Sequence, residues 1–228
     1  MVMICEKHKL AFFGLPKVAS TTLKHILYEL DHGYPFDRAA HGGQSVHAVY
    51  PSRPNMTPAR MEALSDYWRF TVVRDPAKRI LSVYANRIYD HWDLLQGRLA
   101  RPRARLLGLD LKPDPDTFLR KMHRYRLQSG SIRHHTDPMV AFLGKDLSKL
   151  DAFYRFEDLD RLAADLSART GKDIAFPRFQ TNKAVRRKTR LDDLSDAGFE
   201  ALMRFTEVDY KLLAGLYDRP QRRPVAAE

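Results

Sequence analysis

Twice in this sequence a short apolar segment runs into a polar turn and then into a segment with helical periodicity. The first is LAFFGL at 10–15, a continuous apolar run typical of a strand buried on both faces, and it stops at Pro16. From Ser20 onward, apolar residues fall at i, i+3, i+4 and i+7, and Gly33 lies just beyond them. This stretch predicts a strand, a turn and an amphipathic helix.

The second occurrence begins with RFTVV at 69–73, a further candidate strand. Asp75 supplies a side chain suited to capping a helix, and Pro76 is favoured at the first helical position. Apolar residues then keep a period of about 3.6 as far as residue 90. The repeated order predicts an α/β fold with three layers, in which helices flank a mostly parallel central sheet.

Weaker signals continue this alternation to the end of the chain. Helical periodicity covers 116–127, 158–170 and 193–217, and 152–156 is a short candidate strand. The stretch 97–115 is rich in Arg, Pro and Gly and follows no period, so we expect a long surface connection there.

The length of 228 residues favours one domain, which we expect to span 1–220, followed by a short tail over 221–228. No apolar run approaches the roughly 18 residues that would cross a bilayer, and no secretory leader is recognisable. Cys5 is the single cysteine and has no partner for an internal disulfide, so we expect a cytoplasmic protein.

A net charge of +11 predicts that the protein attracts anions. Nucleic acid, a small polyanionic cofactor and an acidic glycan all fit that field, so charge alone does not choose among them.

The turn after the first strand, FGLPKVASTT at 13–22, has the composition of an anion site. A helix N-terminus offers unpaired amides and the positive end of the helix dipole, Lys17 adds a charge, and Ser20 to Thr22 add hydroxyl donors. The alternative is a simple helix cap with Lys17 in a solvated loop. The GxxxxGK[ST] loop of nucleoside triphosphatases is absent.

The second turn carries RFTVVRDPAKRILSVY at 69–84. Arg74 follows a strand at its carboxyl end, where open α/β sheets place their ligands, and Ser82 lies about two turns into the next helix. A guanidinium and a hydroxyl placed in this way can bind one phosphate. The alternative is a surface ion pair between Arg74 and Asp75.

Together the two segments resemble the sulfotransferases that use 3′-phosphoadenosine 5′-phosphosulfate (PAPS). PKVASTT at 16–22 is similar to their 5′-phosphosulfate loop, and VVRDPAKRILSVY at 72–84 is similar to their 3′-phosphate segment. The likeness is to the carbohydrate (glycan) group, with weaker similarity in YRFEDL at 154–159 and TNK at 181–183.

The resemblance implies a P-loop-like fold and transfer of a sulfuryl group from PAPS to a hydroxyl, by in-line displacement and with release of PAP. Lys17 would stabilise the charge that develops on the leaving oxygen. The 5′-phosphosulfate would be bound by Lys17, Val18, Ala19, Ser20, Thr21 and Thr22, and the 3′-phosphate by Arg74 and Ser82. No metal is expected.

The acceptor hydroxyl must lose a proton, so a general base is expected. Related enzymes carry it between the two cofactor segments, where this chain has His25, His32, His41 and His47. His47, between Val46 and Ala48 as if near a strand end, is the first candidate, and His41 beside two glycines is the second.

The acceptor is expected to be a carbohydrate or another hydroxyl-bearing molecule, anionic ones included. It could contact the basic runs at 98–105 and 186–190, and the second run could instead close over the cofactor. It could also contact His134 and His135, which would point to opposite faces of a strand and therefore suit a metal poorly. Such basic runs are also common in solvated loops. Unlike the Golgi enzymes, the sequence has no anchor and no cysteine pair, which favours a cytoplasmic, bacterial-type enzyme.

Two other functions stay open. A nucleotide-dependent phosphoryl transferase would need a hydroxyl after the loop lysine to hold Mg²⁺. A non-enzymatic basic nucleic-acid-binding module would use the positive charge, but no nucleic-acid-binding motif is recognisable, so no nucleic-acid partner is expected. The sequence does not indicate the oligomeric state.

Overall fold

The computed structural model describes residues 1–52, 61–176 and 189–222. Two compact units make up the chain, and each is formed by two separate segments. The first unit comprises Met1–Arg74 and Met139–Phe179, and the second comprises Asp75–Pro138 and Gln180–Glu228. The single domain over 1–220 and the tail from 221 stay predictions.

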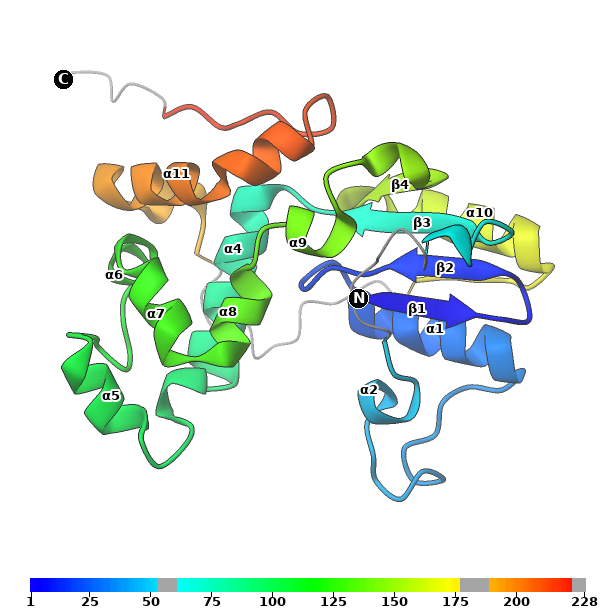
Figure 1. The fold of residues 1–228 in the computed structure, drawn as a ribbon, viewed down its shortest axis with the longest axis horizontal. Helices are drawn as coiled ribbons and strands as arrows, with labels where there is room; N and C mark the ends of the chain where they lie inside the picture. Colours follow the sequence, from blue (N-terminus) through cyan, green and yellow to red (C-terminus); the bar gives the residue numbers. More distant parts are fainter. Residues whose placement is uncertain (53–60, 177–188, 223–228) are drawn as a thin grey trace. The chain divides into compact units, whose positions relative to one another are not determined.

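A four-stranded sheet forms the centre of the first unit (Figure 1). Its strands lie side by side in chain order, with β1 antiparallel to β2 and the other neighbours parallel. The strands are β1 (Val2–Cys5), β2 (Leu10–Phe13), β3 (Trp68–Val73) and β4 (Ala152–Arg155). The register pairs Leu10 with Trp68 and Phe70 with Ala152.

Helices flank this sheet, with α1 (Ser20–His32) packed on β1 and α10 (Leu159–Thr170) packed on β4. All four residues of β2 are buried, as expected for a parallel strand covered on both faces. Stacked rings of Phe12 and Phe70, with centroids 5.3 Å apart, join neighbouring strands in the core. The unit also contains α2 (Val46–Val49), α9 (Val140–Leu143) and the 3₁₀ turns η3 (Leu147–Lys149) and η4 (Phe156–Asp158). The predicted α/β class with a mostly parallel, helix-flanked sheet is confirmed.

The second unit is helical in its described residues. In chain order it contains α4 (Pro76–Tyr84), the π-helical η1 (Ala85–Asp90), the 3₁₀ turn η2 (Asp93–Leu95), α5 (Ala100–Leu106), α6 (Pro115–Arg120), α7 (Met122–Gln128), α8 (Gly130–Thr136), the 3₁₀ turn η5 (Leu191–Asp193) and α11 (Asp196–Leu212). The helix α11 packs against α4 and α6. No helix within the described ranges has the length and apolarity needed to cross a membrane.

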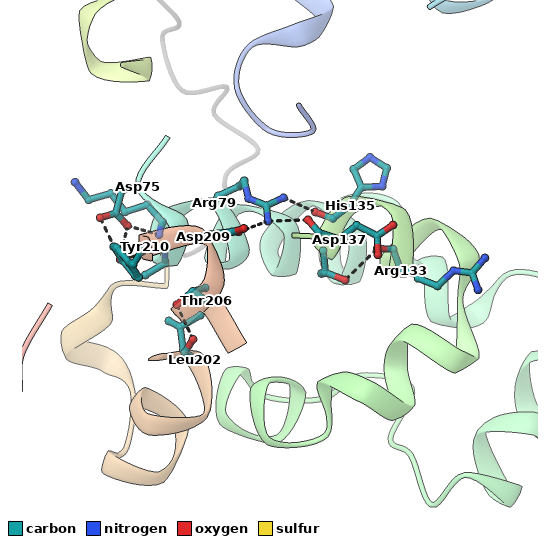
Figure 2. A network of polar contacts seen from close by, with 12 residues as sticks. Asp75, Arg79, Arg133, His135, Asp137, Leu202, Thr206, Asp209 and Tyr210 are labelled. Carbon is teal, nitrogen blue, oxygen red and sulfur yellow. Dashed lines mark hydrogen bonds and ion pairs between the residues drawn. The ribbon is translucent and has the colours of Figure 1, made fainter. Parts of the chain in front are cut away.

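A buried arginine organises this unit (Figure 2). Arg79 on α4 is fully buried and forms an ion pair with Asp209 of α11 at 3.0 Å. Its guanidinium also donates to the backbone carbonyls of His135 and Asp137 at the end of α8. Tyr210, next to Asp209, donates to the carboxylate of Asp75, which caps α4 by accepting from the Lys78 amide. Pairing of this kind is what a buried charge requires.

Several element boundaries agree closely with the sequence predictions. The helix predicted from Ser20 ends at His32, and Gly33 follows with φ of 84°, the left-handed geometry that glycine adopts easily. The strand at 69–73, the helix after Asp75, the strand at 152–156 and the helix up to Gly171 are also confirmed. The helix predicted over 116–127 is present as two helices, because Lys121 leaves helical geometry.

The prediction of an irregular connection over 97–115 is wrong, because α5 lies within it. Ala100 and Ala104, four residues apart, are buried on its inner face. Pro102 sits in the first turn, where the missing amide hydrogen costs no helical bond.

Candidate active site

The loop between β2 and α1 has a backbone that side chains disfavour. Lys17 has φ of 70° and Ala19 has φ of 61°, both in the left-handed region that residues with a Cβ seldom adopt. Alternation of this kind turns successive amides toward one concave side, which is a common way to bind an anion. Ala19 is the N-cap of α1 and no side chain caps that helix, so its first-turn amides are available to a ligand.

Two side chains of this loop hold its backbone in place. Val18 is fully buried, which anchors the centre of the loop in the core. The hydroxyl of Ser20 donates to the carbonyl of Leu15, so this serine braces the turn. Thr21 is exposed and Thr22 half-buried.

Arg74 meets this loop from the end of β3. Its Nη1 donates to the carbonyl oxygen of Lys17 at 3.2 Å, although the two residues are 57 positions apart. Its guanidinium also lies 4.5 Å from the ring centroid of Phe156, which follows β4. The carboxyl ends of three neighbouring strands thus bring two cationic residues to one edge of the sheet, where a parallel sheet places its ligands.

Ser82 lies on α4, in the second unit, and is half-buried there. Arg74 closes the first segment of the other unit. The pairing of Arg74 and Ser82 on one phosphate therefore stays a prediction.

His47 reaches the loop from α2. Its Nε2 and the hydroxyl of Thr21 lie 3.1 Å apart and share a hydrogen bond. Burial, and then the positive charges of Lys24 and His25, lower the pKa of His47 below its ordinary value of 6.5. A lowered pKa keeps the ring neutral near pH 7, which is the form a general base needs. The predicted strand end around His47 is wrong, because Val46–Val49 forms a helix.

His41 has a different environment. Its Nε2 lies 2.9 Å from the hydroxyl of Tyr28, and its ring stacks on Phe36 with centroids 5.1 Å apart and an interplanar angle of 4°. Tyr28 in turn stacks on His32. The structure therefore places His41 in an aromatic cluster, whereas His47 contacts the anion loop.

The remaining candidate residues lie elsewhere. Asn182, Lys183 and the basic residues 186–188 lie outside the described residues, and Thr189 and Arg190 precede η5. His134 and His135 lie on α8, so the prediction of a strand there is wrong. Within the described ranges, no group of three or more His, Cys, Asp or Glu side chains could hold a metal ion.

Comparison with known protein families identifies the family of the chain that carries this loop. The family model described as the sulfotransferase family matches residues 1–219. The chain belongs to the sulfotransferase family. Membership implies PAPS as the co-substrate.

Three curated relatives of this sulfotransferase family member are named carbohydrate sulfotransferase 10. The protein from Pongo abelii is 28% identical over 95 residues, that from Gallus gallus 30% over 96 residues, and that from Danio rerio 30% over 91 residues. Each match covers 38% of this chain and 25% of the relative, so it spans about a quarter of the relatives' own length. No solved structure matches the chain.

The residues of this family member fit such a co-substrate chemically. PAPS carries a phosphosulfate and a separate phosphate, and the described site offers a left-handed loop at Lys17 and Ala19 with Arg74 hydrogen-bonded to it. Charge-assisted bonds from ammonium and guanidinium groups to phosphate oxygens are among the stronger hydrogen bonds in proteins. The loop geometry therefore suits the anionic end of PAPS.

Two residues at this site were not predicted from the sequence. Lys24 is almost fully buried on α1, and burial lowers the pKa of its ammonium group. A lysine beside the apolar positions Leu23 and Leu27 was the available signal. Phe156 was part of a segment already singled out, but nothing local in the sequence indicates that its ring contacts Arg74.

Proposed function

We propose that this chain is a PAPS-dependent sulfotransferase that transfers a sulfuryl group to a hydroxyl of a carbohydrate or another small acceptor and releases PAP. The observation that carries the proposal is the meeting of three segments in the first unit. The Lys17 loop, Arg74 at the end of β3 and His47 on α2 are linked by hydrogen bonds of 3.1 and 3.2 Å. Family membership supplies the chemistry that this arrangement suits.

In the proposed reaction each residue has a distinct part. His47 takes the proton of the acceptor hydroxyl at Nε2 while the acceptor oxygen bonds to sulfur. The bond from sulfur to the bridging oxygen breaks on the opposite side, and Lys17 stabilises the charge that develops on that oxygen. The amides of residues 18–22 hold the phosphosulfate in line, and Arg74 and Ser82 bind the 3′-phosphate.

The acceptor, the domain boundaries and the cellular location in this proposal each rest on one observation. A carbohydrate acceptor is supported by the names of relatives that match over part of their length. A single domain over 1–220 is supported by a family match that ends at 219. A cytoplasmic location is supported by the single cysteine, since no internal disulfide is available.

The deciding experiment compares ligand-induced shifts of the thermal unfolding midpoint for PAP, ADP and ATP. A ligand that binds the folded state raises its stability with the logarithm of saturation. We expect a shift with PAP well above that with ADP, because only PAP carries the 3′-phosphate. Equal shifts, or none, would contradict the proposal and favour a phosphoryl transferase or a nucleic-acid-binding protein.

Site variants then separate binding from chemistry. Losing a charge-assisted hydrogen bond costs about 1.5–3 kcal/mol, so Lys17→Ala and Arg74→Ala should each weaken PAP binding about 10- to 100-fold. His47→Ala should bind PAP almost as the parent does and lose turnover. Transfer of labelled sulfate from PAPS to a panel of sugars measures that turnover.

A further inference from the structure

The helix α5 exposes an apolar ridge between arginines. Leu99, its N-cap residue, is 73% exposed, and Leu106, its last residue, is 86% exposed. With Pro102 between them they follow the i, i+3, i+7 spacing of one helix face. Arg101 and Arg105 fall on one flank of this ridge and Arg103 on the other, because successive residues turn by about 100°.

This helix is held firmly on its opposite side. Ala104 is buried, and the side-chain amide of Gln128 on α7 donates to the carbonyl of Ala100 at 2.8 Å. Lys121 donates to the carbonyl of Gly108, just past the end of α5, also at 2.8 Å. The exposed ridge is therefore a fixed feature of the second unit, and Figure 1 shows α5 beside α7.

The turn that precedes α5 also exposes apolar side chains next to a positive charge. Trp92 is 41% exposed, and the ammonium of Lys112 lies 4.9 Å from its ring centroid. Leu95, on η2, is 37% exposed, and η2 packs against α5. Tryptophan is enriched at the boundary between water and lipid, where one end of its ring system is apolar and the other is wet.

The exposed charge of this segment is positive. Residues 94–109 contain four arginines and no aspartate or glutamate, and Asp93 just before them is buried and pairs with Arg87 at 3.8 Å. An acidic polysaccharide would match that charge but offers little apolar surface to bury leucines. An anionic lipid surface matches both the positive charge and the exposed leucines. Leucines insert at the headgroup boundary, while the apolar stems of the arginines lie along it and keep their guanidinium groups among the phosphates.

We propose that α5 and the adjoining turn, residues 92–106, dock the protein on an anionic lipid surface. The leucine ridge enters the headgroup layer and the flanking arginines pair with lipid phosphates. This proposal does not depend on the transfer reaction, since it is argued from the exposure and charge of residues 92–106 alone.

The test is co-sedimentation of the full chain with vesicles of phosphatidylcholine, with and without phosphatidylserine, at low and high salt. We expect sedimentation that requires phosphatidylserine and falls at high salt. Arg101→Gln with Arg105→Gln should weaken binding about 30-fold, since each cation near such a surface contributes about fivefold. Leu99→Ser with Leu106→Ser keeps the charge and should weaken binding about tenfold or more.

Val208→Ser is the matched control, because Val208 on α11 is 45% exposed and lies outside the segment. It should bind vesicles as the parent does, and thermal unfolding verifies that every variant is folded. Failure to sediment, or unchanged sedimentation of the leucine variant, overturns the proposal. Two alternative results also overturn it: binding of an acidic polysaccharide that ignores the leucine changes, and a dimer in gel filtration that those changes dissociate without any vesicle binding.

Discussion

At the scale of single residues, the pH dependence of turnover reports on His47. Only the neutral ring can accept a proton, so kcat/KM should fall as pH drops through the pKa of His47. Burial and the neighbouring cations lower that pKa, so the midpoint of the acid limb should lie below 6.5. A pH profile of sulfate transfer measures it. A midpoint above 6.5, or normal turnover in His47→Ala, would exclude His47 as the base and leave His41 as the next candidate.

Lys24 provides a second test at this scale. Its positive charge lowers the pKa of His47, and methionine has a similar length and no charge. In Lys24→Met the acid limb should therefore move to higher pH while the shift in unfolding midpoint with PAP stays close to that of the parent. An acid limb that does not move would show that the charge of Lys24 does not contribute to the lowered pKa of His47.

At the scale of elements, the packing of α11 on α6 predicts that replacing a helical glycine with alanine lowers stability, although this change usually raises it. A Cβ at Gly198 would lie 1.6 Å from a carboxylate oxygen of Asp116, and that oxygen accepts from the Ser195 hydroxyl at 2.7 Å. Gly to Ala within a helix ordinarily stabilises by about 1 kcal/mol. Here the clash should reverse the sign and destabilise by about 1–3 kcal/mol.

Urea unfolding of Gly198→Ala measures this change. Gly130→Ala on α8 is the matched control, because its new Cβ meets nothing within 4 Å, and we expect it to be neutral or stabilising. Equal stability of the two variants would contradict the packing of α11 on α6.

Elements with a strong period could be predicted and those defined by tertiary packing could not. The helix from Ser20 and the strand β2 follow directly from apolar spacing. By contrast, α5 has two small apolar residues at helical spacing among arginines, too few for a periodic signal, and packing on η2 and α7 stabilises it. β1 is four residues long and pairs only at one edge of the sheet, so the sequence alone did not distinguish it.

At the scale of the whole molecule, the candidate site depends on a tertiary contact between two segments that are far apart in the sequence, and local patterns do not encode that contact. Each segment, the Lys17 loop and Arg74, could be recognised as anion-binding from its own residues. Their contact arises because parallel pairing of β2 with β3 brings the carboxyl ends of both strands together. His47 was ranked ahead of His41 from the sequence, but on an expected strand end that is in fact a helix. Tertiary contacts give a different reason for the same order, because His47 shares a hydrogen bond with Thr21 whereas His41 contacts Tyr28.

The rate at which a thiol reagent labels the single cysteine measures how the sheet of the first unit opens. Cys5 on β1 is fully buried, and burial raises the pKa of its thiol to about 12, so it should react with a thiol reagent only when the structure opens. If that opening is the global unfolding that bound PAP suppresses, saturating PAP should slow labelling by about the factor 1 + [PAP]/Kd. Local fraying of β1, an edge strand, would instead give labelling that PAP does not slow. We expect slowing in proportion to PAP, measured against the Kd from an independent titration, with denatured protein giving one reactive thiol per chain as the control.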